Sequence, residues 1–85
     1  MFFSCNVQFY NVNNVKDIVY IKCFGENLRR IRTSKSISQE VLAYSSDVPI
    51  SQIGRIERGE INTTISTVKV IAIALNIPIK ELFEF

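Results

Sequence analysis

One stretch in the middle of the chain constrains the fold more than any other feature: residues 38–59 read SQEVLAYSSDVPISQIGRIERG. It holds two short helical patterns, and Asp47 and Pro49 bracket the few residues that separate them. So short a connection brings two helices together as a crossed pair, which is the layout of a helix-turn-helix. In that motif the second helix is free to enter the major groove of DNA.

The first helix of the pair has an expected cap, an inner side and a turn residue. Ser38 is expected to cap it, and Val41 and Leu42 are expected to face the core. Ala43 lies in the middle of the helix, where a larger side chain would push the second helix away. The turn needs a residue that tolerates a positive φ, which Asp47 does, although less readily than glycine.

The second helix of the pair, predicted at about 50–58, has an outer face of mostly polar side chains. Ile53 and Ile56 form its inner stripe, and Gly59 ends it. With these two isoleucines inside, a step of about 100° per residue leaves five residues outward or flanking. They are Ile50, Ser51, Gln52, Arg55 and Arg58. Hydroxyl, amide and guanidinium groups bond to base edges and phosphates, so this face predicts contact with DNA.

A longer helix is predicted ahead of the pair. Apolar residues recur every three or four positions from Val15 onward, so this helix is expected to run to about Ser34. Asn14 is its expected N-cap, with Asp17 in the first turn, where a carboxylate interacts favourably with the helix dipole. The pattern allows one continuous helix or two pieces broken near Gly25.

Two more helices are predicted after the pair. The first covers residues 65–75 and ends at Asn76, and Pro78 then opens a short helix over 79–83. The apolar positions expected to bury the longer one are Ile65, Val68, Ile71, Ala72 and Leu75. Five helices with short connections predict a compact all-α domain, which we place at residues 15–85.

Residues 1–14 differ from this domain because they carry no charge and are rich in Phe, Asn and Val. Partial alternation at Cys5, Val7 and Phe9 is typical of a short strand. Two interpretations stay open for this N-terminal arm. It is either a loosely packed segment or a strand exchanged with a second subunit.

Composition excludes several classes of protein. The 85 residues suffice for one small domain, and 47% hydrophobic with 21% charged residues is typical of a globular chain. The net charge of +2 is too small to establish a polyanionic partner, so the position of the charges matters more. The chain has no histidine, no nucleophile with a base at motif spacing and no glycine-rich phosphate loop, which argues against an enzyme.

The lack of histidine and the spacing of the two cysteines also argue against a bound cofactor or metal. Cys5 and Cys23 match no CxxC pattern, and without histidine no ordinary zinc site can be assembled. We expect free thiols in a reducing compartment. The N-terminus has neither the basic region of a signal peptide nor an apolar run long enough for a membrane span, so a cytoplasmic location is expected.

Four fragments in fixed order carry a family resemblance: GENLRRIR, SQEVLA, IGRIERGE followed by Asn62, and IALNIPIKELF. Together they resemble the phage repressor/Cro family, often called XRE-type regulators, over roughly residues 24–83. The resemblance implies a repressor-like domain that binds double-stranded DNA and regulates transcription. Two reading helices about one DNA turn apart are needed for tight specific binding, which implies a homodimer on a two-fold-related operator.

The resemblance also assigns roles by position. The base-reading positions are occupied by Ile50, Ser51, Gln52 and Arg55. The positions that contact the DNA backbone are occupied by Gln39, Arg58, Asn62 and Thr63. Gln39 is also implied to prop the reading helix. Arg32 and Glu57 match an ion pair that ties the first helix to the third.

Three residues at the tip of the motif depart from the family pattern. Asp47 replaces a glycine, Pro49 stands in place of a Ser or Thr cap, and Ile50 replaces a polar base reader. An isoleucine can pack against a thymine methyl but cannot recognise guanine or adenine by hydrogen bonds. These departures bear on which DNA sequence is read.

Several alternatives stay open from the sequence. The chain could be a helical protein-interaction module, antitoxin-like or a scaffold, with little DNA affinity. Arg55 could form a surface pair with Glu57 or Glu60 instead of reading a base. The dimer surface could be the apolar C-terminus, with Leu82, Phe83 and Phe85, or the N-terminal arm. The settings implied are a phage or mobile-element repressor, a restriction–modification controller, or an antitoxin with a toxin partner.

Overall fold

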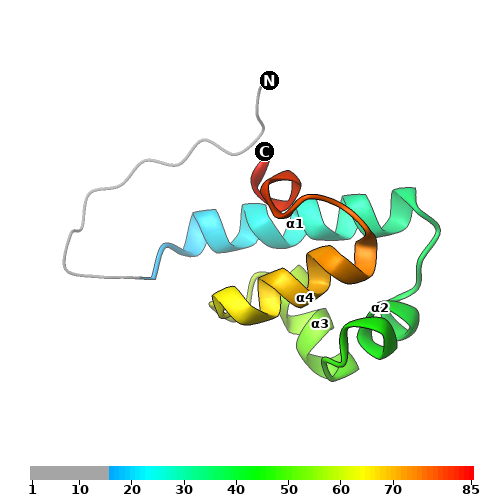
Figure 1. The fold of residues 1–85 in the computed structure, drawn as a ribbon. Helices are drawn as coiled ribbons and strands as arrows, with labels where there is room; N and C mark the ends of the chain where they lie inside the picture. Colours follow the sequence, from blue (N-terminus) through cyan, green and yellow to red (C-terminus); the bar gives the residue numbers. More distant parts are fainter. Residues whose placement is uncertain (1–15) are drawn as a thin grey trace.

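The computed structural model describes residues 16–85 and folds them into four α-helices and one short 3-10 helix (Figure 1). Their bounds are α1 Ile18–Ser34, α2 Gln39–Ser46, α3 Ile50–Glu57, α4 Ile65–Leu75 and η1 Ile79–Phe83. The predicted all-α class is confirmed, with the last helix of the 3-10 type. The N-terminal arm, for which a strand was one interpretation, lies outside the described residues.

The start of α1 differs from the prediction. Its N-cap is Asp17, whose carboxylate accepts a hydrogen bond of 3.0 Å from the backbone N–H of Tyr20. The expected cap, Asn14, lies outside the described residues. Asp17 is therefore the cap and not a first-turn residue. The helix runs through Gly25 without a break.

Within residues 16–85, every α-helix is followed by a residue in the left-handed conformation. These residues are Ser36, Asp47, Gly59 and Asn76, with φ between 58° and 72°. In each case the next backbone N–H donates a hydrogen bond to a carbonyl five residues back, as in a Schellman motif. The sequence prediction of a positive φ at Asp47 and of helix ends at Gly59 and Asn76 is confirmed.

The core lies between α1 and the other four elements. Leu28, Ile53, Ile71 and Leu82 are fully buried and come from α1, α3, α4 and η1 respectively. Full burial of one such side chain is worth about 1.5–3 kcal/mol, so these residues fix how the helices pack. η1 lies against α1 on the side away from α2 and α3 (Figure 1).

The prediction that Val41 and Ile65 belong to the core is wrong, since both side chains are exposed. Val41 is 53% exposed, because α2 packs through Leu42 and Ala43 and Val41 lies outside that contact. Ile65 is 83% exposed, because it is the first residue of α4 and no other helix within residues 16–85 covers it. In both cases the spacing was correct and the position of the neighbouring helices decided which side was buried.

The cysteine prediction also needs a correction. Cys23 is buried in α1, and its sulfur takes part in a disulfide bond instead of being a free thiol. Cys5 lies outside the described residues. No helix in residues 16–85 has the length and apolar character needed to cross a membrane.

Gly25 is needed where α1 crosses the end of α3. A methyl group at Gly25 would overlap the carbonyl oxygens of Ile56 and Glu57, which are backbone atoms and cannot rotate away. Gly25→Ala is therefore expected to lower the free energy of unfolding by about 1–3 kcal/mol. Urea denaturation measures this loss.

Gly54 supplies the matched control for this substitution. A methyl group at Gly54 would lie 3.0 Å from the end of the exposed Arg58 side chain and at an ordinary 3.8 Å from Oε1 of Gln39, and would meet no backbone atom of another helix. Since alanine is favoured over glycine inside a helix by about 1 kcal/mol, Gly54→Ala should leave stability equal or slightly higher. Equal losses at Gly25 and Gly54 would contradict the close helix crossing.

Candidate nucleic-acid interface

The outward side of α3 carries most of the predicted base-reading residues. Ile53 and Ile56 are buried beneath it and anchor the helix to the core. Ile50, Ser51 and Arg55 are exposed, and Gln52 is half-buried. The structure thus brings these four side chains to one accessible helix, whose surface offers a hydroxyl, an amide, a guanidinium and one branched apolar group.

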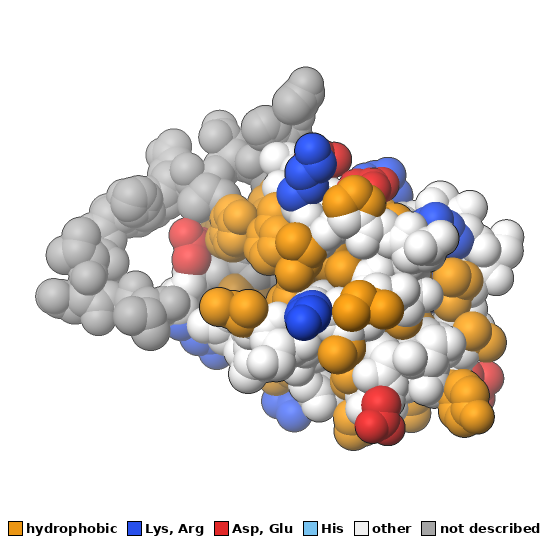
Figure 2. All heavy atoms as spheres, in the orientation of Figure 1, with side chains coloured by type: hydrophobic (Ala, Val, Ile, Leu, Met, Phe, Trp, Pro, Cys, Tyr) orange, Lys and Arg blue, Asp and Glu red, His pale blue; other side chains and the backbone are white. Residues whose placement is uncertain are grey.

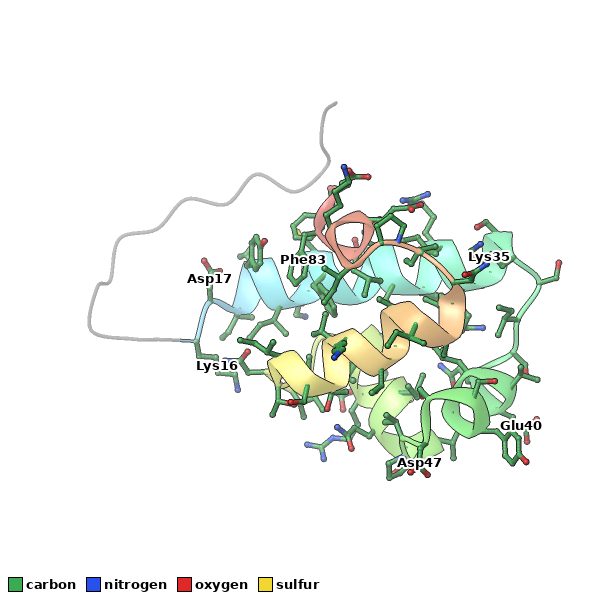
Figure 3. All side chains as sticks on the ribbon, viewed as in Figure 1. Lys16, Asp17, Lys35, Glu40, Asp47 and Phe83 are labelled. Carbon is green, nitrogen blue, oxygen red and sulfur yellow. The ribbon has the colours of Figure 1, made fainter. Side chains whose placement is uncertain are left out.

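The turn before α3 sets where that helix begins. Asp47 lies in this turn, at the lower edge of the molecule in Figure 3, with φ 58° and ψ 40°. Pro49 follows in the N-cap position and offers no side-chain acceptor to the first turn of α3. Val48 between them is buried. The turn is held by packing and backbone hydrogen bonds, without the side-chain cap present at α2.

A buried polar network joins the first three helices. Arg32 of α1 donates hydrogen bonds of 2.6 and 3.0 Å to the two carboxylate oxygens of Glu57, at the end of α3. Gln39, the first residue of α2, donates from its amide to the same carboxylate at 2.9 Å. Arg32 and Glu57 are 8% and 6% exposed. Glu57 therefore couples α3 to both neighbouring helices.

A second charged cluster lies on the surface just after α3. Glu60 accepts a hydrogen bond of 2.7 Å from Nε of Arg58, and its other carboxylate oxygen lies 3.9 Å from Nε of Arg55. The hydrogen bond from Arg58 lowers the pKa of the Glu60 carboxyl. The charges of Arg58, Arg55 and Lys22 act in the same direction. Glu60 is therefore ionised at neutral pH beside two of the predicted DNA-contacting arginines.

Two residues after α3, Asn62 and Thr63, are predicted to contact the DNA backbone, but only one of them is exposed. Asn62 is exposed in the segment between α3 and α4. The Oγ1 atom of Thr63 is shut off from solvent and has no hydrogen-bond partner in the described part of the chain. Thr63 lies instead along an apolar pocket of about 350 Å³ between α1, α4 and η1. Its hydroxyl does not reach the surface that Asn62 occupies.

The rim of this pocket forms an exposed apolar face. We use that name for the side chains of Tyr20, Ile65, Ile79 and Phe83, which line the pocket and are exposed to solvent. Figure 2 shows hydrophobic side chains gathered over the first part of α1, η1 and α4. Phe83 lies on the η1 side of the molecule, away from Asp47 at the lower edge (Figure 3). The predicted dimer residue Leu82 is fully buried and cannot be part of it.

Sequence reasoning missed two residues near the motif. Tyr44 is 90% exposed on α2, one helical turn from Val41, and its hydroxyl could bond a phosphate. The inward assignment of Val41 hid this face of α2. Lys22 of α1 packs against Gly59 and so lies beside the charged cluster. Its place in the sequence, far ahead of the motif, gave no signal.

Comparisons with known proteins agree with this geometry. The helix-turn-helix family model matches residues 28–82. The control protein C.BamHI of Bacillus amyloliquefaciens is 41% identical over 63 residues, which are 73% of this chain and 78% of that protein. The control protein C.SmaI of Serratia marcescens is 42% identical over 58 residues, 68% of this chain and 69% of that protein.

A solved structure is similar over nearly its whole length. The crystal structure of the restriction–modification controller protein C.AhdI from Aeromonas hydrophila matches with a TM-score of 0.73 and 41% sequence identity. The match covers 74% of this chain and 96% of that one. The restriction–modification controller protein C.Esp1396I matches with a TM-score of 0.71 and 31% identity.

Proposed function

The chain belongs to the XRE-type helix-turn-helix family, and from this premise we propose that it regulates transcription by inserting α3 into the major groove of double-stranded DNA. The outward side of α3 carries this proposal, because its side chains are exposed while the helix is anchored through Ile53 and Ile56. A rigidly held helix with polar groups on its free side is what direct readout of base edges requires.

We assign the contacts as follows. Ser51, Gln52 and Arg55 read base edges by hydrogen bonding, and Ile50 packs against a thymine methyl. The pair between Arg55 and Glu60 does not prevent this, since exposed ion pairs are worth about 0–1 kcal/mol. The residues assigned to the DNA backbone are Gln39, Arg58 and Asn62. Thr63 is left out because its hydroxyl is buried.

Gln39 combines two roles in this assignment. One N–H of its amide group is used on Glu57, at 2.9 Å, which holds α2 against α3. An amide nitrogen has two donors, so the second N–H can bond a phosphate. The start of α2 is thereby positioned by the same residue that would meet the DNA backbone.

We propose that the protein acts as a homodimer that pairs through the apolar face. Exposed contiguous apolar surface usually marks a protein–protein contact. Phe83 of the apolar face lies on the η1 side of the molecule and Asp47 at the lower edge away from it, so pairing through Phe83 leaves that turn uncovered (Figure 3). A two-fold-related operator then receives one α3 from each subunit.

The relatives support one biological setting over the others. Both curated relatives are control proteins, and C.AhdI is a restriction–modification controller. We propose the same setting for this chain: a non-enzymatic regulator that acts in the cytoplasm, where its DNA lies. The rival interpretation, a protein-interaction module without DNA affinity, predicts no salt-sensitive retention on random-sequence duplex.

Selection of bound duplexes from a random pool tests the proposal. Wild-type protein is expected to enrich a two-fold-related sequence. Arg55→Ala should lose the preferred base at one position in each half-site, worth about 1–3 kcal/mol, while its affinity for random duplex falls much less, by the loss of a phosphate contact alone. Arg29→Ala, which removes an exposed arginine from α1, is the control and should enrich the wild-type sequence. If wild-type protein enriches no sequence and binds no duplex at low salt, the proposal fails.

A further inference from the structure

Glu60 occupies an unusual place in a repeated structural pattern. Within residues 16–85, four helix ends share the same hydrogen-bonded reversal. At three of them the residue after the left-handed position is apolar and packs on or in the core. Those residues are Ile37, Val48 and Ile77. At the end of α3 the equivalent residue is Glu60, whose side chain is 47% exposed.

The backbone reversal at Gly59 aims Glu60 back along α3. The N–H of Glu60 donates to the carbonyl of Arg55 at 2.9 Å, and Gly59 has a φ of 72°. A side chain in this position normally makes an apolar contact with the residue five places earlier. Here the contact is between charges, because Nε of Arg55 lies 3.9 Å from the Glu60 carboxylate.

Glu60 therefore lies among cations that would meet DNA. It contacts Arg55 and Arg58, and Lys22 of α1 is near enough to act on its charge. No carboxylate occupies the exposed positions of α3 itself, since Glu57 is buried. The carboxylate of Glu60 therefore lies beside the exposed side of α3 because the backbone reverses at Gly59, after the helix.

We propose that Glu60 is a specificity-determining residue that competes with phosphate for Arg55 and Arg58 and so weakens binding to DNA of the wrong sequence. This inference rests on the proposed function. On random duplex the arginines gain only phosphate contacts, which an ion pair with Glu60 partly replaces. On the correct site Arg55 also bonds to a base edge. The ion pair with Glu60 does not make up for this base contact, so Glu60 weakens binding to random duplex more than binding to the correct site.

The proposal predicts a change in selectivity from one neutralised charge. Glu60→Gln removes the charge and keeps the side-chain length. It is expected to raise affinity for random duplex by about 3- to 10-fold and to steepen the fall of log K with log salt by up to about one unit. Affinity for the selected operator should rise less, so the ratio of specific to random binding falls. Fluorescence anisotropy across a salt series measures both affinities.

Glu84→Gln is the matched control, because it removes the same charge from the end of η1, on the edge of the molecule away from α3 (Figure 1). It is expected to change random-duplex affinity by less than about 2-fold. Equal effects of the two variants, or no loss of selectivity in Glu60→Gln, would overturn the role of Glu60. That outcome differs from failure of the proposed function, in which wild-type protein shows no salt-sensitive DNA binding at all.

Discussion

Ile65→Glu is expected to separate the proposed dimer and to weaken operator binding by about 10²- to 10⁴-fold, which is the gain in affinity that two linked binding sites have over one. Ile65 is 83% exposed and lines the apolar pocket, so a charge there would be buried by a second copy but not by the monomer. Glutamate is also tolerated in the first turn of α4. The fold should therefore be unchanged, which circular dichroism can verify.

Ile73→Glu is the control for this variant. Ile73 is also an exposed isoleucine of α4, but it does not line the apolar pocket. Sedimentation equilibrium should show a monomer for Ile65→Glu and a dimer for Ile73→Glu. A dimer for both variants would exclude the apolar face as the subunit interface and leave the N-terminal arm as the alternative.

Replacing Arg32 by alanine is expected to destabilise the domain by about 3–5 kcal/mol, because it leaves the carboxylate of Glu57 buried without its cation. The side chains of Arg32 and Glu57 are 10% and 3% exposed, and two hydrogen bonds join them. A loss of this size approaches the whole stability of many small domains. Chemical denaturation of the variant measures it.

Two further variants separate the charge from the packing. Arg29→Ala removes an exposed arginine from the same helix and should cost less than about 1 kcal/mol. The double variant Arg32→Met with Glu57→Leu removes both charges and should recover most of the lost stability. If the double variant is as unstable as Arg32→Ala, the uncompensated charge is not the cause.

Much of the fold could be predicted because local signals agree with the tertiary structure. Ile53 and Ile56 have helical spacing and are both buried, and Asp47 and Asn76 adopt the left-handed conformation expected at helix ends. Helical spacing and the left-handed conformation at a helix end both depend on residues that are close in sequence. Val41 and Ile65 were assigned to the core by the same spacing, but their exposure depends on where other helices lie.

The site shows the same division. The polar side of α3 follows from its own periodicity, so Ser51 and Arg55 could be found from the sequence. Thr63 could not be excluded, since the inward direction of its hydroxyl depends on packing between α1 and α4. Glu60 was visible as a possible partner of Arg55, but its place beside both arginines depends on the reversal at Gly59.

The carboxylate of Glu57 has a consequence for how the protein meets DNA. Because it accepts hydrogen bonds from Arg32 in α1 and Gln39 in α2, the motif is shaped before binding and loses little conformational entropy on the operator. Such a domain cannot adapt to a half-site of different shape. The bending and twisting needed to fit two subunits must then come from the DNA, so flexible base steps between the half-sites should influence affinity although no side chain touches them.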